Sequence, residues 1–144
     1  MLRFMLEGQQ AHLEMIQGIV NRLSQNSFLL KGWSVLLVSS LFALAALNSN
    51  PLFVYLTYLP VISFWGLDGY FLWQERLFRK LYDHVRKLET GKIDFSMDTS
   101  TGKSQADSVL SVMFSKTLLA FHGTLFMTVV VIMVILIVTS CRGA

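Results

Sequence analysis

The fold of this 144-residue chain is decided by residues 28–73, which read FLLKGWSVLLVSSLFALAALNSNPLFVYLTYLPVISFWGLDGYFLW. Only two formal charges, Lys31 and Asp68, lie in this stretch, and a polar Asn-Ser-Asn-Pro turn divides it into two apolar arms. Each arm has the roughly 20 apolar residues that a membrane-spanning helix needs. The stretch therefore predicts a transmembrane hairpin with spans at 28–47 and 52–73.

The composition of the whole chain also favours a membrane. Hydrophobic residues make up 53% of the chain and charged residues 15%, with a mean hydropathy of +0.55, whereas a soluble domain is about 25% charged. The net charge of +3 does not indicate nucleic acid, because half of the twelve basic residues lie at 76–92, directly after the second span. Basic residues in that position are typical of a cytoplasmic flank. The expected partner is the lipid bilayer, and no nucleic acid is expected.

The segments on either side of the hairpin have helical patterns. Residues 1–27 place apolar side chains at three- and four-residue spacing, which predicts an amphipathic cytoplasmic helix. Helical register continues after the second span through 74–88, and its apolar face is a natural partner for that first helix. Whether residues 1–47 form one continuous helix stays open, because the polar run 25–27 does not force a break. Pro60 is expected to bend the second span or to free a carbonyl near residues 55–61.

The rest of the chain contains a loop and a third span. The segment 74–117 is predicted to be a cytoplasmic stalk helix followed by a loop, and 118–140 a third transmembrane helix. Within the loop, residues 93–97 alternate apolar and polar side chains, which indicates either a short strand paired with another subunit or an irregular loop. We therefore expect an all-α membrane protein: three transmembrane helices and a cytoplasmic helical hairpin, made of the N-terminal amphipathic helix and the extension of span two.

The distribution of basic residues predicts the topology. The long basic segment after span two and the N-terminus should be cytoplasmic, and the turn between spans one and two, which has no basic residue, should face outward. An odd number of spans then places the tail 141–144 outside. The expected location is a bacterial inner membrane, with the chain crossing it several times.

One polar layer is predicted inside the spans. Lys31 and Asp68 are equidistant from the turn, so both lie about 28 Å below it at 1.5 Å per residue. His122 belongs to the same depth, measured from the far end of the third span. A Lys–Asp–His layer at the cytoplasmic mouth would suit a gate or a proton relay, because intramembrane charges mark functional sites. In the alternative, Lys31 extends to the headgroups, Asp68 stays hydrated and His122 simply flanks its span.

Small residues in the first two spans predict close helix packing. Gly66 and Gly69 flank Asp68 in span two, and Ser39 and Ala43 give span one a small-residue surface. Small side chains let helix backbones approach within a membrane. This packing would be within one chain or between copies of a homo-oligomer.

The stalk carries a basic face that lipid headgroups or a soluble partner would contact. A soluble partner would dock on 74–88, and the basic residues concerned are Arg76, Arg79, Lys80, Arg86 and Lys87. Arg79 and His84 also resemble the Arg–His spacing of HEPN-type ribonucleases, although their separation places them on different helix faces.

No sequence motif indicates an enzyme. The chain has no HExxH, GxSxG or phosphate-binding loop, and its single cysteine, Cys141, excludes a cysteine-based metal cluster. We therefore expect no catalytic residues, no cofactor and no metal site.

The layout of helix and spans resembles a known functional class. The residues concerned are the helix 12–23, the run Asn26–Trp33, and the run Phe64–Tyr70 leading into Gln74–Tyr82. Their arrangement resembles small multi-span inner-membrane proteins that serve as effectors or accessory subunits in bacterial anti-phage and abortive-infection systems. The resemblance implies an oligomeric effector that forms a pore or depolarises the membrane when its cytoplasmic part is triggered. The alternatives are a non-conducting scaffold that docks a soluble partner and, third, a membrane-tethered ribonuclease.

Overall fold

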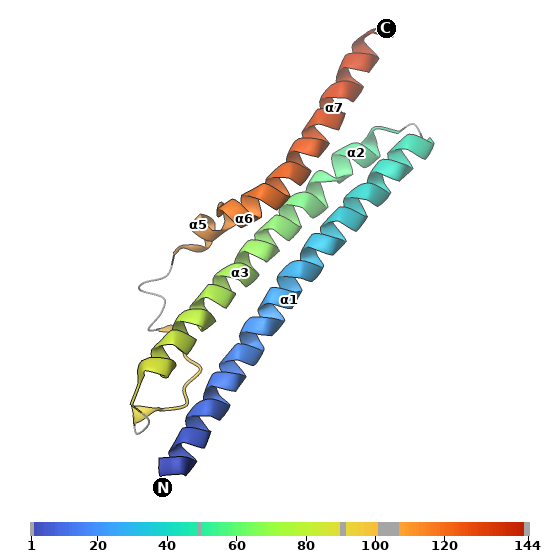
Figure 1. The fold of residues 1–144 in the computed structure, drawn as a ribbon. Helices are drawn as coiled ribbons and strands as arrows, with labels where there is room; N and C mark the ends of the chain where they lie inside the picture. The colour runs from blue at the N-terminus through green and yellow to red at the C-terminus, as the bar shows by residue number, and fades with distance from the viewer. Residues whose placement is uncertain (1, 49, 90–91, 101–106, 143–144) are drawn as a thin grey trace.

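The computed structural model describes residues 2–48, 50–89, 92–100 and 107–142. Figure 1 shows α1 and α3 running side by side along most of their length, with the later helices beside α3 and the two termini at opposite ends. The elements in chain order are α1 (Leu2–Asn48), α2 (Leu52–Leu56), α3 (Tyr58–Lys87), α5 (Val109–Met113), α6 (Lys116–Leu118), the π-helical turn η2 (Leu119–Gly123) and α7 (Thr124–Arg142).

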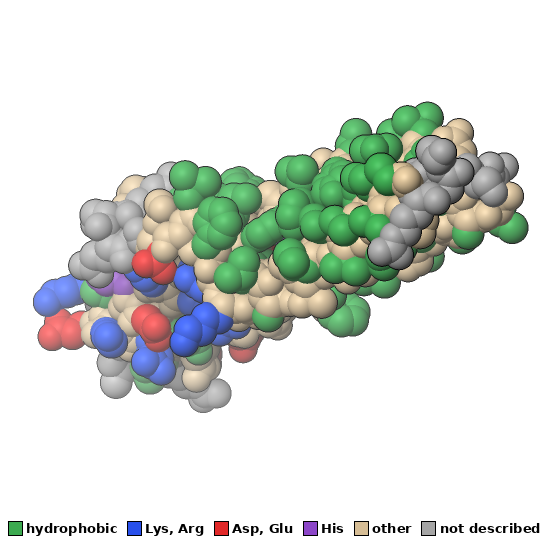
Figure 2. All heavy atoms as spheres, turned by 90° about the horizontal axis from the view of Figure 1, so that it is seen from above, with side chains coloured by type: hydrophobic (Ala, Val, Ile, Leu, Met, Phe, Trp, Pro, Cys, Tyr) green, Lys and Arg blue, Asp and Glu red, His purple; other side chains and the backbone are tan. Residues whose placement is uncertain are grey.

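Three stretches are long and apolar enough to cross a membrane: Leu6–Leu47, Leu52–Lys87 and Lys116–Thr139. Figure 2 shows the charged side chains gathered at one end of the molecule, while hydrophobic side chains cover much of the remaining length. The described residues contain helices, turns and loops but no strand. The predicted all-α architecture is confirmed, and its three apolar helices support a multi-pass membrane protein.

The first helix is continuous from the charged end to the turn. The run 25–27, at the predicted boundary between the amphipathic helix and span one, lies inside α1 without a break. This run contains neither Gly nor Pro, so the backbone hydrogen bonds continue through it. The hydroxyl of Ser27 bonds to side chains of its own and a neighbouring helix. Residues 2–27 and 28–47 therefore belong to one continuous helix.

The second apolar arm is divided near its start. Pro60 has no backbone N–H and cannot donate to the carbonyl four residues earlier. The helix is interrupted at Thr57, whose N–H and hydroxyl both bond to the Val54 carbonyl, at 3.2 and 2.6 Å. Thr57 then begins α3, because its own carbonyl accepts from Val61 N–H at 3.3 Å. The break lies within residues 55–61, the turn in which Pro60 is predicted to bend the helix or free a carbonyl.

The α1–α3 pair is held by two separate apolar clusters. At the charged end, Ile16 of α1 packs against Leu81 and Val85 of α3, which is the pairing predicted for the stalk; the partly buried side chains around this cluster are Leu13, Phe78, Tyr82 and Met97. Near the turn, Val38, Val61 and Val129 bring α1, α3 and α7 together. Burial at both ends fixes the antiparallel register of the hairpin, and this register places the polar residues between the two clusters.

The alternating residues after α3 form a loop. The polar positions make local turns: Ser96 N–H donates to Asp94 Oδ1 at 3.0 Å, and Asp98 N–H donates to Ser96 Oγ at 3.1 Å. Asp and Ser commonly bond to the backbone two residues on, which competes with strand formation. Within the chain, residues 93–97 therefore form a loop of successive side-chain turns, and their pairing with another subunit stays a prediction.

The third apolar rod begins and ends elsewhere than predicted. It starts at Lys116 after a short break at Phe114–Ser115, and it includes one π-helical turn before α7. The helix α7 continues to Arg142, so residues 141–142 of the predicted external tail are helical. Cys141 lies in the last helical turn and is exposed, while residues 143–144 lie outside the described part of the chain.

Candidate functional site

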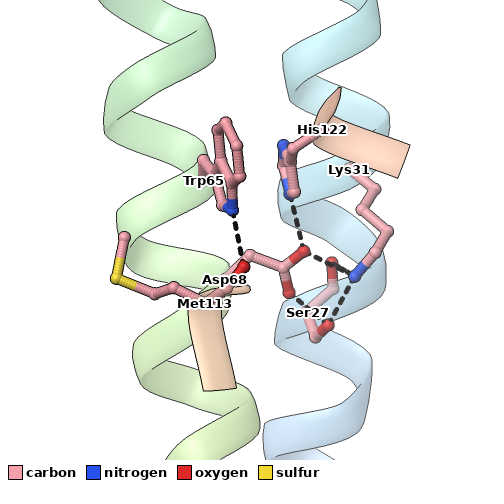
Figure 3. A network of polar contacts seen from close by, with 6 residues as sticks. All are labelled: Ser27, Lys31, Trp65, Asp68, Met113 and His122. Carbon is pink, nitrogen blue, oxygen red and sulfur yellow. Dashed lines mark hydrogen bonds and ion pairs between the residues drawn. The ribbon is translucent and has the colours of Figure 1, made fainter. Parts of the chain in front are cut away.

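Asp68 is the centre of a polar cluster that joins all three apolar rods. Its side chain is fully buried. One carboxylate oxygen, Oδ2, lies 2.6 Å from Lys31 Nζ and 2.8 Å from His122 Nε2, and the other, Oδ1, accepts a hydrogen bond from Ser27. Figure 3 shows these side chains converging from the two long helices and the third rod. The cluster therefore links α1, α3 and η2 through one carboxylate.

Lys31 belongs to this cluster. Its ammonium also donates to Ser27 Oγ at 2.8 Å, and its side chain is only 21% exposed. One carboxylate and one ammonium balance in charge, which is how buried ions are tolerated in an apolar environment. The alternative in which Lys31 reaches the headgroups and Asp68 stays hydrated does not describe this structure.

His122 enters the cluster from the π-helical turn η2. An ionised carboxylate only accepts hydrogen bonds, so His122 Nε2 carries the hydrogen that faces Asp68. The imidazole is fully buried and stacks on the Trp65 ring, with centroids 6.0 Å apart and an interplanar angle of 8°. Its Nδ1 is buried and has no hydrogen-bond partner among the described residues. Single π-helical turns are frequent at functional sites.

Trp65 fastens the end of α5, just before the third rod, to α3. Its indole N–H donates to the Met113 carbonyl at 2.9 Å, at the point where α5 ends. Met113 also packs directly over Gly69, where a Cβ atom would lie 2.3 Å from Met113 Cγ. A Cβ at Gly66 would meet nothing within 4 Å. Gly69 is thus the glycine that permits close packing inside the chain, and Gly66 does not serve this purpose.

This difference gives a paired prediction. Gly69→Ala is expected to destabilise the protein by about 1–3 kcal/mol, because the added carbon forces Met113 away from α3. Gly66→Ala, one turn earlier on the same helix, is the matched control and should be neutral or stabilising by up to about 1 kcal/mol through helix propensity. The free energy of unfolding in detergent micelles measures both, and equal effects at the two positions would contradict this packing.

The small residues of span one lie on the outside of the chain. Ser39 and Ala43 are both exposed on α1. They therefore do not pack within the described part of this chain, and their surface is left to lipid or to a second copy.

The basic stalk is a surface of local ion pairs. Arg76 pairs with Asp107 at 3.0 Å, Arg79 with Glu75 at 2.8 Å, and Arg86 with Asp83 at 3.3 Å. The Arg76–Asp107 and Arg86–Asp83 pairs are exposed and contribute only about 0–1 kcal/mol each, whereas Glu75 is buried, at 7% exposure. Lys80 is half-buried and Lys87 exposed. His84 borders a small hollow beneath residues 92–98, whereas Arg79 is engaged by Glu75.

Sequence reasoning missed Ser27 and Met113. Ser27 carried a signal, since it lies one helical turn before Lys31 and so shares its face. Met113 carried none, because its bond to Trp65 depends on how α5 meets α3.

The site has none of the donor sets of a metal centre. Over the described ranges, no group of three or more His, Cys, Asp and Glu side chains is placed to hold a metal ion. Comparisons with protein-family models, curated proteins and solved structures found no match. The function is therefore argued from the polar cluster and its surroundings.

Proposed function

We propose that this chain is a non-enzymatic, oligomeric effector of the bacterial inner membrane, which depolarises the membrane when its charged, cytoplasmic end is triggered. The observation that carries this proposal is the buried cluster of Lys31, Asp68 and His122 inside three apolar rods. Ionisable side chains at such positions are costly and are usually retained for function. The cytoplasmic placement of the N-terminus and the external placement of the C-terminus follow from the basic flanks.

The cluster acts as a latch in this proposal. A single carboxylate holds groups from α1 and from η2, so the three rods cannot separate without exposing a charge to an apolar environment. One chain with these side chains satisfied internally is a closed, resting state. Conduction would need several copies whose cluster residues turn toward a shared path, and the exposed Ser39 and Ala43 surface supports such self-association.

The direct test is membrane potential during expression in a bacterial host. A voltage-sensitive dye should report depolarisation for the wild type, and Asp68→Asn should depolarise at a lower amount of membrane-inserted protein because its latch is weakened. Asp83→Asn is the matched control, since that carboxylate is 58% exposed on the same helix. The proposal fails if expression leaves the potential unchanged, or if the protein is monomeric by light scattering in detergent.

The second candidate is a membrane scaffold that docks a soluble partner on 74–88. The observation that favours it is the arrangement of the stalk: α1 already covers its apolar face at Leu77, Leu81 and Val85, which leaves a charged outer face. An acidic protein would fit this face better than an apolar one. A stable soluble partner that is lost in an Arg79→Glu/Arg86→Glu variant, without any depolarisation, would favour the scaffold.

RNA cleavage by the wild type that is lost in His84→Ala would favour the third candidate, a membrane-tethered ribonuclease.

A further inference from the structure

Residues 92–100, here called the strap, close the seam between α1 and α3 at the charged end. Met97 packs against the cluster formed by Ile16, Leu81 and Val85. The ring of Phe95 lies on α1, with its centroid 5.6 Å from the ring centroid of His12. The strap therefore contacts both long helices and bridges them.

The contact between Phe95 and α1 is specific but covers only one side of the ring. A Cβ atom at Gly8 would lie 3.2 Å from Phe95 Cζ, so the absence of a side chain there makes room for the ring. Phe95 is nevertheless 52% exposed, so only one side of it is held. Its backbone φ is 54°, in the left-handed region that a Phe rarely adopts. Such conformations persist only where their surroundings hold them, and they cluster at switch regions.

The side chain beneath the strap is also unsatisfied. His12 is fully buried, and neither of its ring nitrogens has a hydrogen-bond partner among the described residues. Buried polar groups without a partner are uncommon and unfavourable. Lifting the strap would give the imidazole access to water and release the strained Phe95 backbone. Two unfavourable features thus oppose the apolar contacts that keep the strap closed.

The helix beneath the strap leads directly to the polar cluster. His12 and Ser27 lie on the same unbroken helix, about 22 Å apart at 1.5 Å per residue. Close to the strap, the Gln9 side chain donates to the Val85 and Leu88 carbonyls at 3.2 and 3.5 Å, which ties α1 to the end of α3. A displacement of α1 from α3 at this end would therefore reach Ser27 and Lys31 through a rigid rod.

From this geometry we infer that the strap is an autoinhibitory closure. While Phe95 is seated on Gly8 and His12, α1 is held against α3 and the cluster around Asp68 stays closed. A trigger acts by displacing the strap, after which α1 shifts and Ser27 and Lys31 move away from Asp68. This inference rests on the proposed function, because it identifies the element of the cytoplasmic end that the trigger acts on.

The test uses two variants that loosen the strap and one that does not. Phe95→Ala removes the ring, and Gly8→Ala, the milder change, crowds its seat. Gly18→Ala is the matched control, because a Cβ at this position of the same helix meets nothing within 4 Å. Hydrogen exchange of the strap amides reports its opening, since the N–H groups of Ser96, Asp98 and Ser100 donate to side chains of other strap residues.

A second readout follows the cluster itself. In a Trp33→Phe/Trp73→Phe background, Trp65 is the remaining tryptophan, and its emission reports the stacked His122. Phe95→Ala and Gly8→Ala should accelerate strap exchange by about tenfold and change Trp65 emission, while Gly18→Ala should do neither.

The outcomes separate this inference from the proposed function. Unchanged strap exchange in both variants would show that Phe95 does not hold the strap, and faster exchange without a change in Trp65 emission would show that the strap is not coupled to the cluster. Either result overturns the inference. If exchange and emission both change while the membrane potential does not, the coupling stands and the depolarising function fails.

Discussion

Asp68→Asn is expected to lower the free energy of unfolding by about 3–5 kcal/mol, because it leaves the Lys31 ammonium buried without its counter-charge. The amide is close to the carboxylate in shape, so the loss reflects charge rather than volume. Reversible unfolding in detergent micelles measures the effect. The exposed Arg76–Asp107 pair is the matched control: Asp107→Asn should cost less than about 1 kcal/mol, although its ion pair is also formed, at 3.0 Å.

A double variant separates the pair from the rest of the cluster. Lys31→Met combined with Asp68→Asn removes both charges, and it should cost less than the two single changes together by about 0.5–3 kcal/mol. Replacing both partners by uncharged side chains avoids the cost of leaving one ion buried alone. Strict additivity of the two changes would mean that Lys31 and Asp68 do not form the pair seen at 2.6 Å.

His122→Ala should produce the second large effect. Its Nε2–H donates to a charged acceptor, and a hydrogen bond of that kind contributes about 1.5–3 kcal/mol. The change also removes the ring that stacks on Trp65, so unfolding in micelles and Trp65 emission should both respond. His122→Gln places an amide N–H near the position of Nε2 and should restore most of the stability.

The same pair of variants tests how His122 contributes. If His122→Gln restores stability and also the resting membrane potential, the residue acts through its hydrogen bond alone. If His122→Ala unfolds with the free energy of the wild type, the bond to Asp68 does not contribute to stability. The cluster would then not hold the third rod to α1 and α3.

Much of the fold was predictable from local patterns. The three apolar stretches follow from length and hydropathy, and the interruption by Pro60 follows from its missing N–H. The shared depth of Lys31 and Asp68 follows from their equal distance from the turn, and the register of the hairpin brings them into contact. The alternation at 93–97 was ambiguous, because polar side chains that bond to the local backbone have the same period of two as a half-buried strand.

Spacing along the chain encodes which segments are helical, where the chain turns and which charges lie at one depth. Helix packing, in contrast, buries Asp68 fully, places Met113 against Gly69 rather than Gly66, and brings Phe95 onto His12. Each of these depends on contacts between residues far apart in the chain, and no local pattern specifies which faces of two helices meet. The positions of the two charges inside residues 28–73 are therefore evident from the sequence. Their contacts with Ser27 and His122 result from how the helices pack.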